Sequence, residues 1–185
     1  MRARVIFGGF LLVVAVLVVQ VVRKEQVLAH GTPVLLELAP VDPRSLMQGD
    51  YMVLDYAVSR EARLANDTDR DSDWDLDSSP APRERPKEGR LVLRLDENGV
   101  GRFVRHDAPG TPLAPGELLL RYKVREGRVR LGAEAFFFQE GHADRYEGAK
   151  YGELRVTGDG SSVLVGLRDA GRQPLGSALQ GGDTQ

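Results

Sequence analysis

The chain contains no cysteine and only three histidines, and its 185 residues are 6% aromatic. The absence of cysteine excludes a disulfide framework, which an exported domain of this size does not require. The histidines at positions 30, 106 and 142 are scattered, and none forms the closely spaced pair that is typical of a zinc site. No phosphate-binding loop or dinucleotide fingerprint is present, since the glycines fall in segments typical of hairpin turns. We therefore predict no metal and no other cofactor.

The chain also lacks an excess of charge of either sign. The 25 basic residues nearly balance the 27 acidic ones, and the formal net charge is −2. A protein that binds nucleic acid through its backbone phosphates needs a clear excess of positive charge. Composition therefore provides no electrostatic argument for a nucleic-acid partner.

A long apolar run lies near the amino terminus. Val5 to Val22 is interrupted only by Gln20, and its 18 residues would span roughly 27 Å as a helix. The alternative is a cleaved signal peptide with a cleavage site at Val27-Leu28-Ala29. Its apolar region would be only about 7–15 residues long, and three charged residues, 23–25, separate the run from that site. We predict an uncleaved transmembrane anchor over residues 1–25.

The charges that flank this run bear on its orientation. Arg2 and Arg4 precede the run, whereas Arg23 and Lys24 follow it and are partly offset by Glu25. The positive-inside rule then favours a cytoplasmic amino terminus, although the asymmetry is small. We expect a single-pass inner-membrane protein whose carboxyl-terminal domain, residues 26–176, is periplasmic, followed by a polar tail over 177–185.

Most of the remaining chain has the alternating pattern of half-buried strands. Apolar residues occupy every second position in four segments, and turn-forming sequences follow at positions 96–99, 125–127, 158–160 and 169–171. The four segments are residues 34–38, 90–95, 118–125 and 128–137. This pattern predicts a mainly β fold, an antiparallel sandwich or partly open barrel. One short helix is expected at His142–Lys150, where Ala143, Tyr146, Glu147 and Lys150 would share a face.

One segment, Leu64–Lys87, breaks the strand pattern because it holds few apolar residues, Trp74 among them. Aspartate occupies every second position from 67 to 77, which suggests a calcium loop. The EF-hand register fails, because the sixth and twelfth loop positions, counted from Asp67, are Ser72 and Ser78. We interpret the segment as a mobile, solvated, acidic insertion on the domain surface.

The most distinctive motif is Gly49-Asp50-Tyr51-Met52-Val53-Leu54-Asp55-Tyr56. Gly49 and Asp50 are typical of a turn, and the six residues that follow have the composition of a strand. Period-two alternation places Tyr56 with Leu54 over the core and Tyr51 on the opposite face. Both tyrosines are expected to pack and to bond their hydroxyls to the backbone, with a ligand contact as the alternative.

These eight residues match, position by position, the motif of the bacterial family that is named GDYXXLXY after it, and the chain resembles that family elsewhere too. Pro40-Val41-Asp42-Pro43-Arg44 precedes the motif, and a second block follows at 138–156, with Phe138-Gln139-Glu140-Gly141 and Tyr151-Gly152-Glu153-Leu154-Arg155. The family has no established biochemical function. Its members are often encoded beside multi-pass membrane proteins, so the resemblance implies such a partner.

The two blocks also define the candidate site. If they converge, they bring together charged and aromatic residues that form either a structural ion-pair network or a binding surface. The candidates are Arg44, Asp50, Tyr51, Tyr56, Glu140, Glu147, Lys150 and Arg155. We expect a membrane-anchored accessory module, with an envelope enzyme or ligand-binding protein that uses an Arg/Asp/Glu cleft as the alternative.

A type I signal peptidase is a further comparison, because it too has an anchor followed by a proline-led loop and a Gly-Asp strand. In this chain Val41 and Asp42 occupy the region where the nucleophilic serine of that family belongs, and Ser45 lies on the other side of Pro43. A serine without an adjacent base is a poor nucleophile. We therefore expect no protease activity and name no catalytic residue.

Overall fold

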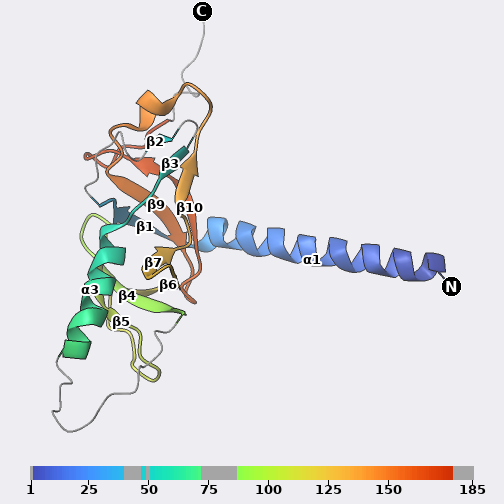
Figure 1. Ribbon diagram of the computed structural model, residues 1–185, viewed down its shortest axis with the longest axis horizontal. Coiled ribbons are helices and arrows are strands. Elements are labelled where there is room, and N and C mark those ends of the chain that lie inside the picture. Colours follow the sequence, from blue (N-terminus) through green and yellow to red (C-terminus); the bar gives the residue numbers. More distant parts are fainter. Residues whose placement is uncertain (1, 40–46, 49–50, 72–86, 177–185) are drawn as a thin grey trace, which may run out of the picture.

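A long helix projects from a β-rich body in the structure, which is a computed structural model that describes residues 2–39, 47–48, 51–71 and 87–176 (Figure 1). This helix, α1 (Arg2–His30), is long and apolar enough to cross a membrane. Its large apolar side chains from Ile6 to Val22 are all exposed to the surroundings, for example 65% at Phe10. No described part of the chain therefore covers the apolar surface of α1.

The helix joins the body through a close contact at its end. The N–H of Gly31 donates to the carbonyl of Val27 (2.9 Å), and Val27 itself is buried. A Cβ at position 31 would come within 2.9 Å of the Arg155 Cβ and closer still to the Val27 carbonyl. Only glycine fits there, so this residue lets the end of α1 approach the sheet beneath it.

The first sheet carries the junction with α1. Its strand order is β1-β9-β10, both pairings are antiparallel, and the bounds are β1 (Thr32–Glu37), β9 (Tyr151–Val156) and β10 (Ser162–Arg168). Residues of β9 alternate between buried and half-buried, with Gly152, Leu154 and Val156 facing the core. The central strand of this sheet therefore comes from the carboxyl-terminal part of the chain and pairs with the strand that follows the helix.

The second sheet has four antiparallel strands in the order β5-β4-β6-β7. Their bounds are β4 (Glu88–Leu95), β5 (Gly101–His106), β6 (Glu117–Arg125) and β7 (Arg128–Leu131). A two-residue turn connects β6 to β7, and both of its residues have positive φ, 52° at Glu126 and 72° at Gly127. This is the hairpin geometry whose twist matches that of the strands. Backbone hydrogen bonds from Leu35 to Gly99 (2.9 Å) and from Arg121 to Gly160 (2.8 Å) join the two sheets.

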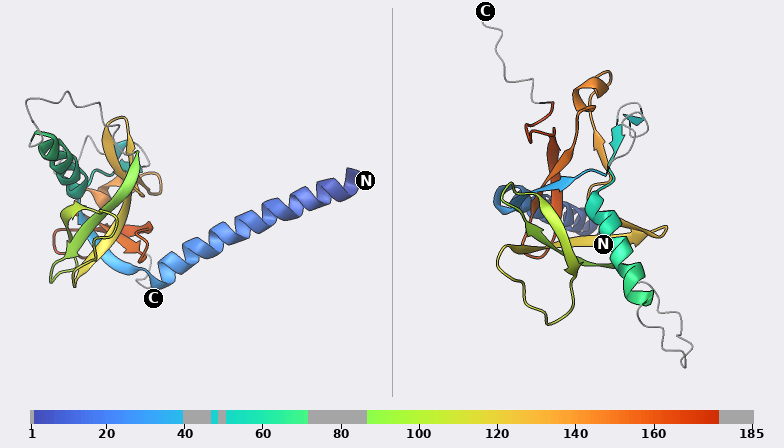
Figure 2. Two further views of the ribbon diagram at one scale, coloured as in Figure 1. Left: turned by 90° about the horizontal axis from the view of Figure 1, so that it is seen from below. Right: turned by 90° about the vertical axis from the view of Figure 1, so that its left-hand side faces the viewer.

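The third sheet is small and holds the first motif. Its order is β2-β3-β8, with β2 (Met47–Gln48), β3 (Tyr51–Val53) and β8 (Ala135–Phe137). All three sheets contribute side chains to one continuous core, which includes Leu36, Met52, Leu120 and Leu154. The predicted class, an amino-terminal apolar helix followed by an antiparallel β fold with a short helix, is confirmed (Figure 2).

The largest difference from the sequence-based expectation is a second helix, α3 (Ala57–Asp71). Val58 and Ala62, four residues apart, are buried against the core, and the Ala62 carbonyl lies 2.9 Å from a ring nitrogen of His106. The first eight residues of the segment interpreted as a mobile insertion, 64–71, thus belong to a helix. Residues 72–86 of that segment, with Trp74, lie outside the described residues, as does the polar tail 177–185, whereas Lys87 is described and its carbonyl accepts from the N–H of Val124 (2.7 Å).

Smaller differences concern four other elements. The strands β5 and β10 were not predicted, although turn sequences lie beside both. The helix expected at His142–Lys150 is a single 3₁₀ turn, η1 (Ala143–Tyr146). The strand expected over Tyr51–Tyr56 ends at Val53, and Tyr56 then makes an isolated bridge to Leu38.

The turn between β9 and β10 generates a prediction about pH. Hydrogen bonds from the Thr157 hydroxyl and the Ser161 N–H, together with the Arg121 guanidinium at 2.9 Å, lower the pKa of Asp159 to about 2. A carboxyl whose pKa is depressed in the folded state stabilises it above its unfolded pKa, about 3.9, and that stabilisation disappears as the pH falls through the folded value. We expect Asp159→Asn to lower the melting temperature at pH 7, and the difference from wild type to vanish between about pH 4 and pH 2. Thermal melts of the detergent-solubilised chain would measure this, and a difference independent of pH would contradict it.

Candidate functional site

The two sequence blocks meet at Tyr56 and Gly152. Tyr56 is 2% exposed, and a Cβ built on Gly152 would lie 3.0 Å from the Tyr56 Cε1 atom. Position 152 is thus a glycine because the tyrosine ring occupies the space above the backbone of β9. Next to this contact, the N–H of Leu38 donates to the carbonyl of Lys150 (2.9 Å) and that of Ala39 to the carbonyl of Asp55 (2.7 Å). Leu38 and Ala39, directly after β1, are therefore bonded to both blocks.

The hydroxyl of Tyr56 is buried and has no hydrogen-bond partner among the described residues. This differs from the expectation that it bonds to the backbone. Burial raises the pKa of Tyr56, so the phenol stays neutral at all physiological pH values. The second tyrosine of the motif therefore contributes to the fold by filling space in the hydrophobic core.

The first tyrosine, Tyr51, lies on the surface side of β3 as the alternation predicts. It is directly opposite Phe137 on β8, with ring centroids 5.6 Å apart, and Phe137 is 74% exposed. We call Tyr51 and Phe137 the aromatic pair. The flanking residues Phe136 and Phe138 point the other way and hold Tyr146 between them, at centroid distances of 5.1 and 5.3 Å. Phe137 is therefore the one phenylalanine of this run that does not pack on Tyr146.

The charged candidates of the second block lie in different surroundings. Lys150 forms an ion pair with Glu37 (3.2 Å), which Arg102 also contacts (3.0 Å). Burial by itself raises the pKa of the Glu37 carboxyl, but the hydrogen bonds from Lys150 and Arg102 outweigh this effect, and the pKa of Glu37 is lowered overall. Arg155 reaches the Gly31 carbonyl at 3.5 Å. These two residues thus contact the body around β1 rather than the acidic candidates.

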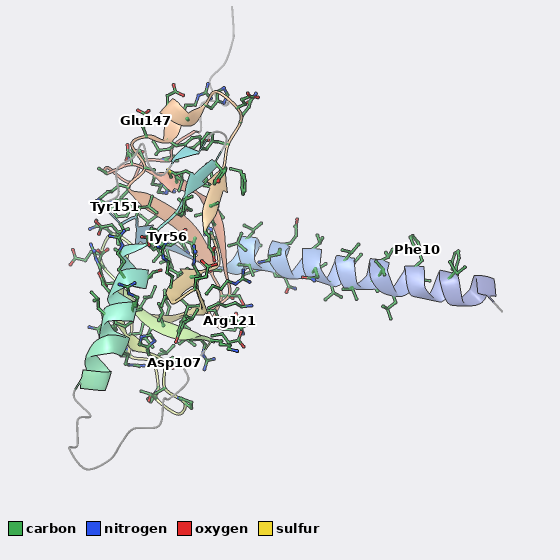
Figure 3. All side chains as sticks on the ribbon, viewed as in Figure 1. Phe10, Tyr56, Asp107, Arg121, Glu147 and Tyr151 are labelled. Atoms are coloured by element: carbon green, nitrogen blue, oxygen red, sulfur yellow. The ribbon has the colours of Figure 1, made fainter. Side chains whose placement is uncertain are left out.

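The other charged candidates form no network with these. Glu140 and Glu147 are exposed, and neither has an ion pair with any residue in the described ranges. Figure 3 shows Glu147 at one end of the body, away from Tyr56. Arg44 and Asp50 lie outside the described residues, so the predicted network that includes them stays a prediction.

The structure contains a cleft that sequence reasoning missed. Its volume is about 880 Å³, and it lies between the end of α1 and the outer face of β4, β6 and β7. Six basic residues line it against two acidic ones, Glu88 and Glu134; the basic residues are Lys24, Arg90, Arg121, Lys123, Arg125 and Arg130. We call it the basic cleft. Figure 3 shows Arg121 on the side of the body from which α1 projects.

A signal for this cleft was present in the sequence. Arg121, Lys123 and Arg125 alternate with apolar residues along β6, and Arg128 and Arg130 do the same along β7. Such residues are ordinarily the solvated side of a half-buried strand. Only the antiparallel pairing of β6 with β7 puts the two basic rows side by side.

Comparison with known proteins identifies the family. The model of the GDYXXLXY protein family matches residues 13–167, most of the chain, so the chain belongs to this family. The match begins within α1 and ends within β10, and it therefore includes both sequence blocks and the basic cleft. No curated protein and no solved structure matches.

Because the buried hydroxyl of Tyr56 has no described partner, we predict that removing it does not destabilise the fold. Leaving a buried polar group without a partner costs about 1–3 kcal/mol, so Tyr56→Phe should leave the free energy of unfolding unchanged or raise it. Tyr56→Ala, which empties the site, should cost about 3–5 kcal/mol. Urea denaturation of the solubilised chain compares the two variants. Destabilisation by Tyr56→Phe of more than about 1 kcal/mol would show that the hydroxyl has a partner in the folded protein.

A second prediction concerns the glycine beneath that ring. Gly152→Ala should destabilise the fold by about 1–3 kcal/mol, because the new methyl group would press on Tyr56 and Leu164. Gly166→Ala, in the neighbouring strand, is the matched control, since a Cβ there meets nothing within 4 Å. Equal effects of both variants would contradict a specific contact between Tyr56 and Gly152.

Proposed function

We propose that this member of the GDYXXLXY family is a membrane-anchored, extracytoplasmic accessory module that docks on a multi-pass membrane protein. The observation that carries the proposal is the combination of an uncovered apolar helix with the exposed Phe137, which packs beside the half-buried Tyr51 on the body to which that helix is joined. The helix supplies attachment to the bilayer. The aromatic pair supplies a surface for a protein partner.

The continuity of α1 through residues 27–29, and its contact with the body there, support an anchor rather than a cleaved signal peptide. The candidate cleavage site at 27–29 lies within the last turns of a continuous helix, and Val27 is 8% exposed. Gly31, directly after it, is held against Arg155 of β9. A signal peptidase would have to extract this segment from its contact with the sheet before cutting it.

The topology gives a direct test. With residues 6–22 in the bilayer and a cytoplasmic amino terminus, a carboxyl-terminal alkaline phosphatase fusion should be active, and the protein should remain in the membrane fraction after alkaline washing. Its amino-terminal peptide, identified by mass spectrometry, should begin near Met1. A soluble mature form that begins at His30 would contradict the anchor.

The aromatic pair supports a protein partner because large exposed apolar groups on soluble surfaces mark interaction sites. Aromatic residues are also enriched among the residues that dominate the affinity of interfaces. Phe137 is the most exposed large apolar side chain of the described body. Tyr51, which belongs to the motif that defines the family, lies directly opposite Phe137 across β3 and β8. The proposed partner surface is therefore centred on the strands β3 and β8.

The partner proposal is tested by purifying tagged variants from solubilised membranes. Phe137→Ser should abolish co-purification of a multi-pass membrane protein, identified by mass spectrometry, and should change the melting temperature by no more than a few degrees. Val165→Ser is the matched control, because Val165 is also exposed (41%) but lies on β10. Retention of the same membrane protein by Phe137→Ser would contradict docking through the aromatic pair.

The alternative function, an envelope ligand-binding protein, gains one specific observation. A cleft of about 880 Å³ is within the range of small-molecule sites, although its lining is basic and does not include Glu140 or Glu147. The cleft lies on β4, β6 and β7, whereas the proposed partner surface lies on β3 and β8, so the two could be occupied independently.

A further inference from the structure

The outer face of the four-stranded sheet carries like charges directly opposite each other. Arg90 is paired with Arg121 across β4 and β6, where Lys123 lies opposite Glu88, and across β6 and β7 Lys123 faces Arg130 and Arg125 faces Arg128. Opposed like charges destabilise a sheet, and protein surfaces normally place opposite charges at such positions. Three like-charged pairs on one face, with Glu88 as the one acidic residue opposite them, are explained if an anion binds between them.

Part of this positive charge is left unbalanced within the protein. Arg90, Arg121 and Arg130 each have a carboxylate partner, Asp107 (2.8 Å), Asp159 (2.9 Å) and Glu134 (3.3 Å) respectively. Within the described ranges, no carboxylate lies within 4.0 Å of Lys123, Arg125 or Arg128. The chain as a whole carries a net charge of −2, so the positive potential is a local property of this face.

The basic cleft is also set at a particular distance from the apolar part of α1. Lys24, which lines it, comes two residues after Val22, the last residue of the apolar run. At 1.5 Å per residue the two Cα atoms differ by roughly 3 Å along the helix axis. When residues 5–22 occupy the hydrocarbon core, Lys24 lies at the level of the lipid headgroups, and the part of the cleft that Lys24 lines lies there with it.

We propose that the basic cleft binds the phosphate groups of anionic phospholipids in the leaflet on which the body rests. This inference depends on the proposed anchoring, since α1 brings the cleft to the headgroup layer. The guanidinium groups of Arg121, Arg125 and Arg130 match phosphate oxygens in geometry, and the amines of Lys24 and Lys123 add point charges. The Ser162 hydroxyl, also in the lining, can donate a further hydrogen bond.

Lipid binding would also orient the body on the membrane. A helix by itself leaves the body free to rotate about and tilt against the bilayer normal. A second attachment through the basic face brings the sheet β4-β6-β7 down onto the headgroups and holds the other faces, with the aromatic pair among them, in a defined direction. The cleft thus gives the accessory module a reproducible orientation toward a neighbouring membrane protein.

The test uses the full chain in a nonionic detergent, which makes it independent of topology and of any protein partner. Dioleoyl phosphatidylglycerol, added in mixed micelles, should raise the melting temperature, because a ligand that binds only the folded state stabilises it. Dioleoyl phosphatidylcholine at the same concentration should not. The shift should weaken at high salt, since exposed charges are screened. If the anchor fails in the fusion experiment but this shift is present, only the proposed function is contradicted.

The decisive variant is Lys123→Gln combined with Arg125→Glu. It removes the two charges of β6 that have no ion-pair partner among the described residues. Lys123→Gln relieves the repulsion with Arg130 but gives up the position opposite Glu88, and Arg125→Glu places a carboxylate opposite Arg128, so the lipid-free protein should be about as stable as wild type. The half-saturating concentration of phosphatidylglycerol should rise about ten-fold or more. The matched control is Arg63→Glu with Arg145→Gln, the same change in charge on α3 and η1, which should respond to the lipid like wild type.

Three outcomes would overturn the inference. The first is no shift with phosphatidylglycerol in wild type. The second is an equal loss of response in the control variant, which would show that only the overall charge matters. The third is an equal shift with inorganic phosphate or glycerol phosphate at the same concentration, which would identify a site for soluble anions rather than for lipids.

Discussion

The contact between the Tyr56 ring and the backbone of Gly152 is the constraint on which the rest of the body depends. It brings the end of the first sequence block over the central strand of the first sheet, and the backbone bonds from Leu38 and Ala39 close the gap between them. β9 in turn pairs with β1, the strand that continues from the membrane helix. A change at this contact therefore reaches both the core and the attachment of α1. The family motif and its distant second block occur together because they form one packing unit.

This arrangement separates the two tyrosines of the motif by function. Tyr56 is enclosed, neutral and without a described hydrogen-bond partner, so its contribution is volume. Tyr51, five residues earlier, lies on the other side of its strand beside the exposed Phe137. A short motif thus places one aromatic residue in the core and another, half-buried, beside the exposed Phe137. The buried tyrosine holds β3 in place, and β3 holds the aromatic pair.

On the basic face, electrostatic repulsion between like charges opposes the fold. Repulsion between Arg125 and Arg128, and between Lys123 and Arg130, works against the hairpin that contains them. The hairpin is stabilised by other means: its two-residue turn has the favoured positive φ angles, and Val129, Leu131 and Tyr122 lie in the core. Burial of apolar side chains on the inner face outweighs screened repulsion on the outer one. The fold can therefore maintain a surface potential that its average composition conceals.

Local patterns in the sequence were enough to determine the anchor-like helix, the β class and the side of motif residues 51–56. The apolar run from Val5 to Val22 depends only on length and hydropathy, and the alternation at Met52, Leu54 and Tyr56 only on periodicity; the structure agrees with both. α3 was missed because its buried stripe is narrow, consisting mainly of Val58 and Ala62, and the neighbouring aspartates dominated the interpretation. The basic rows of β6 and β7 are visible as alternation in the sequence, but the cleft that they help to line is not. Lys24, Arg90, Arg121 and Arg130 are far apart in the sequence, and only the pairing of β4, β6 and β7 beside the end of α1 brings them together. Periodicity is a local property, whereas the joining of separate charges into one site is decided by strand order and register.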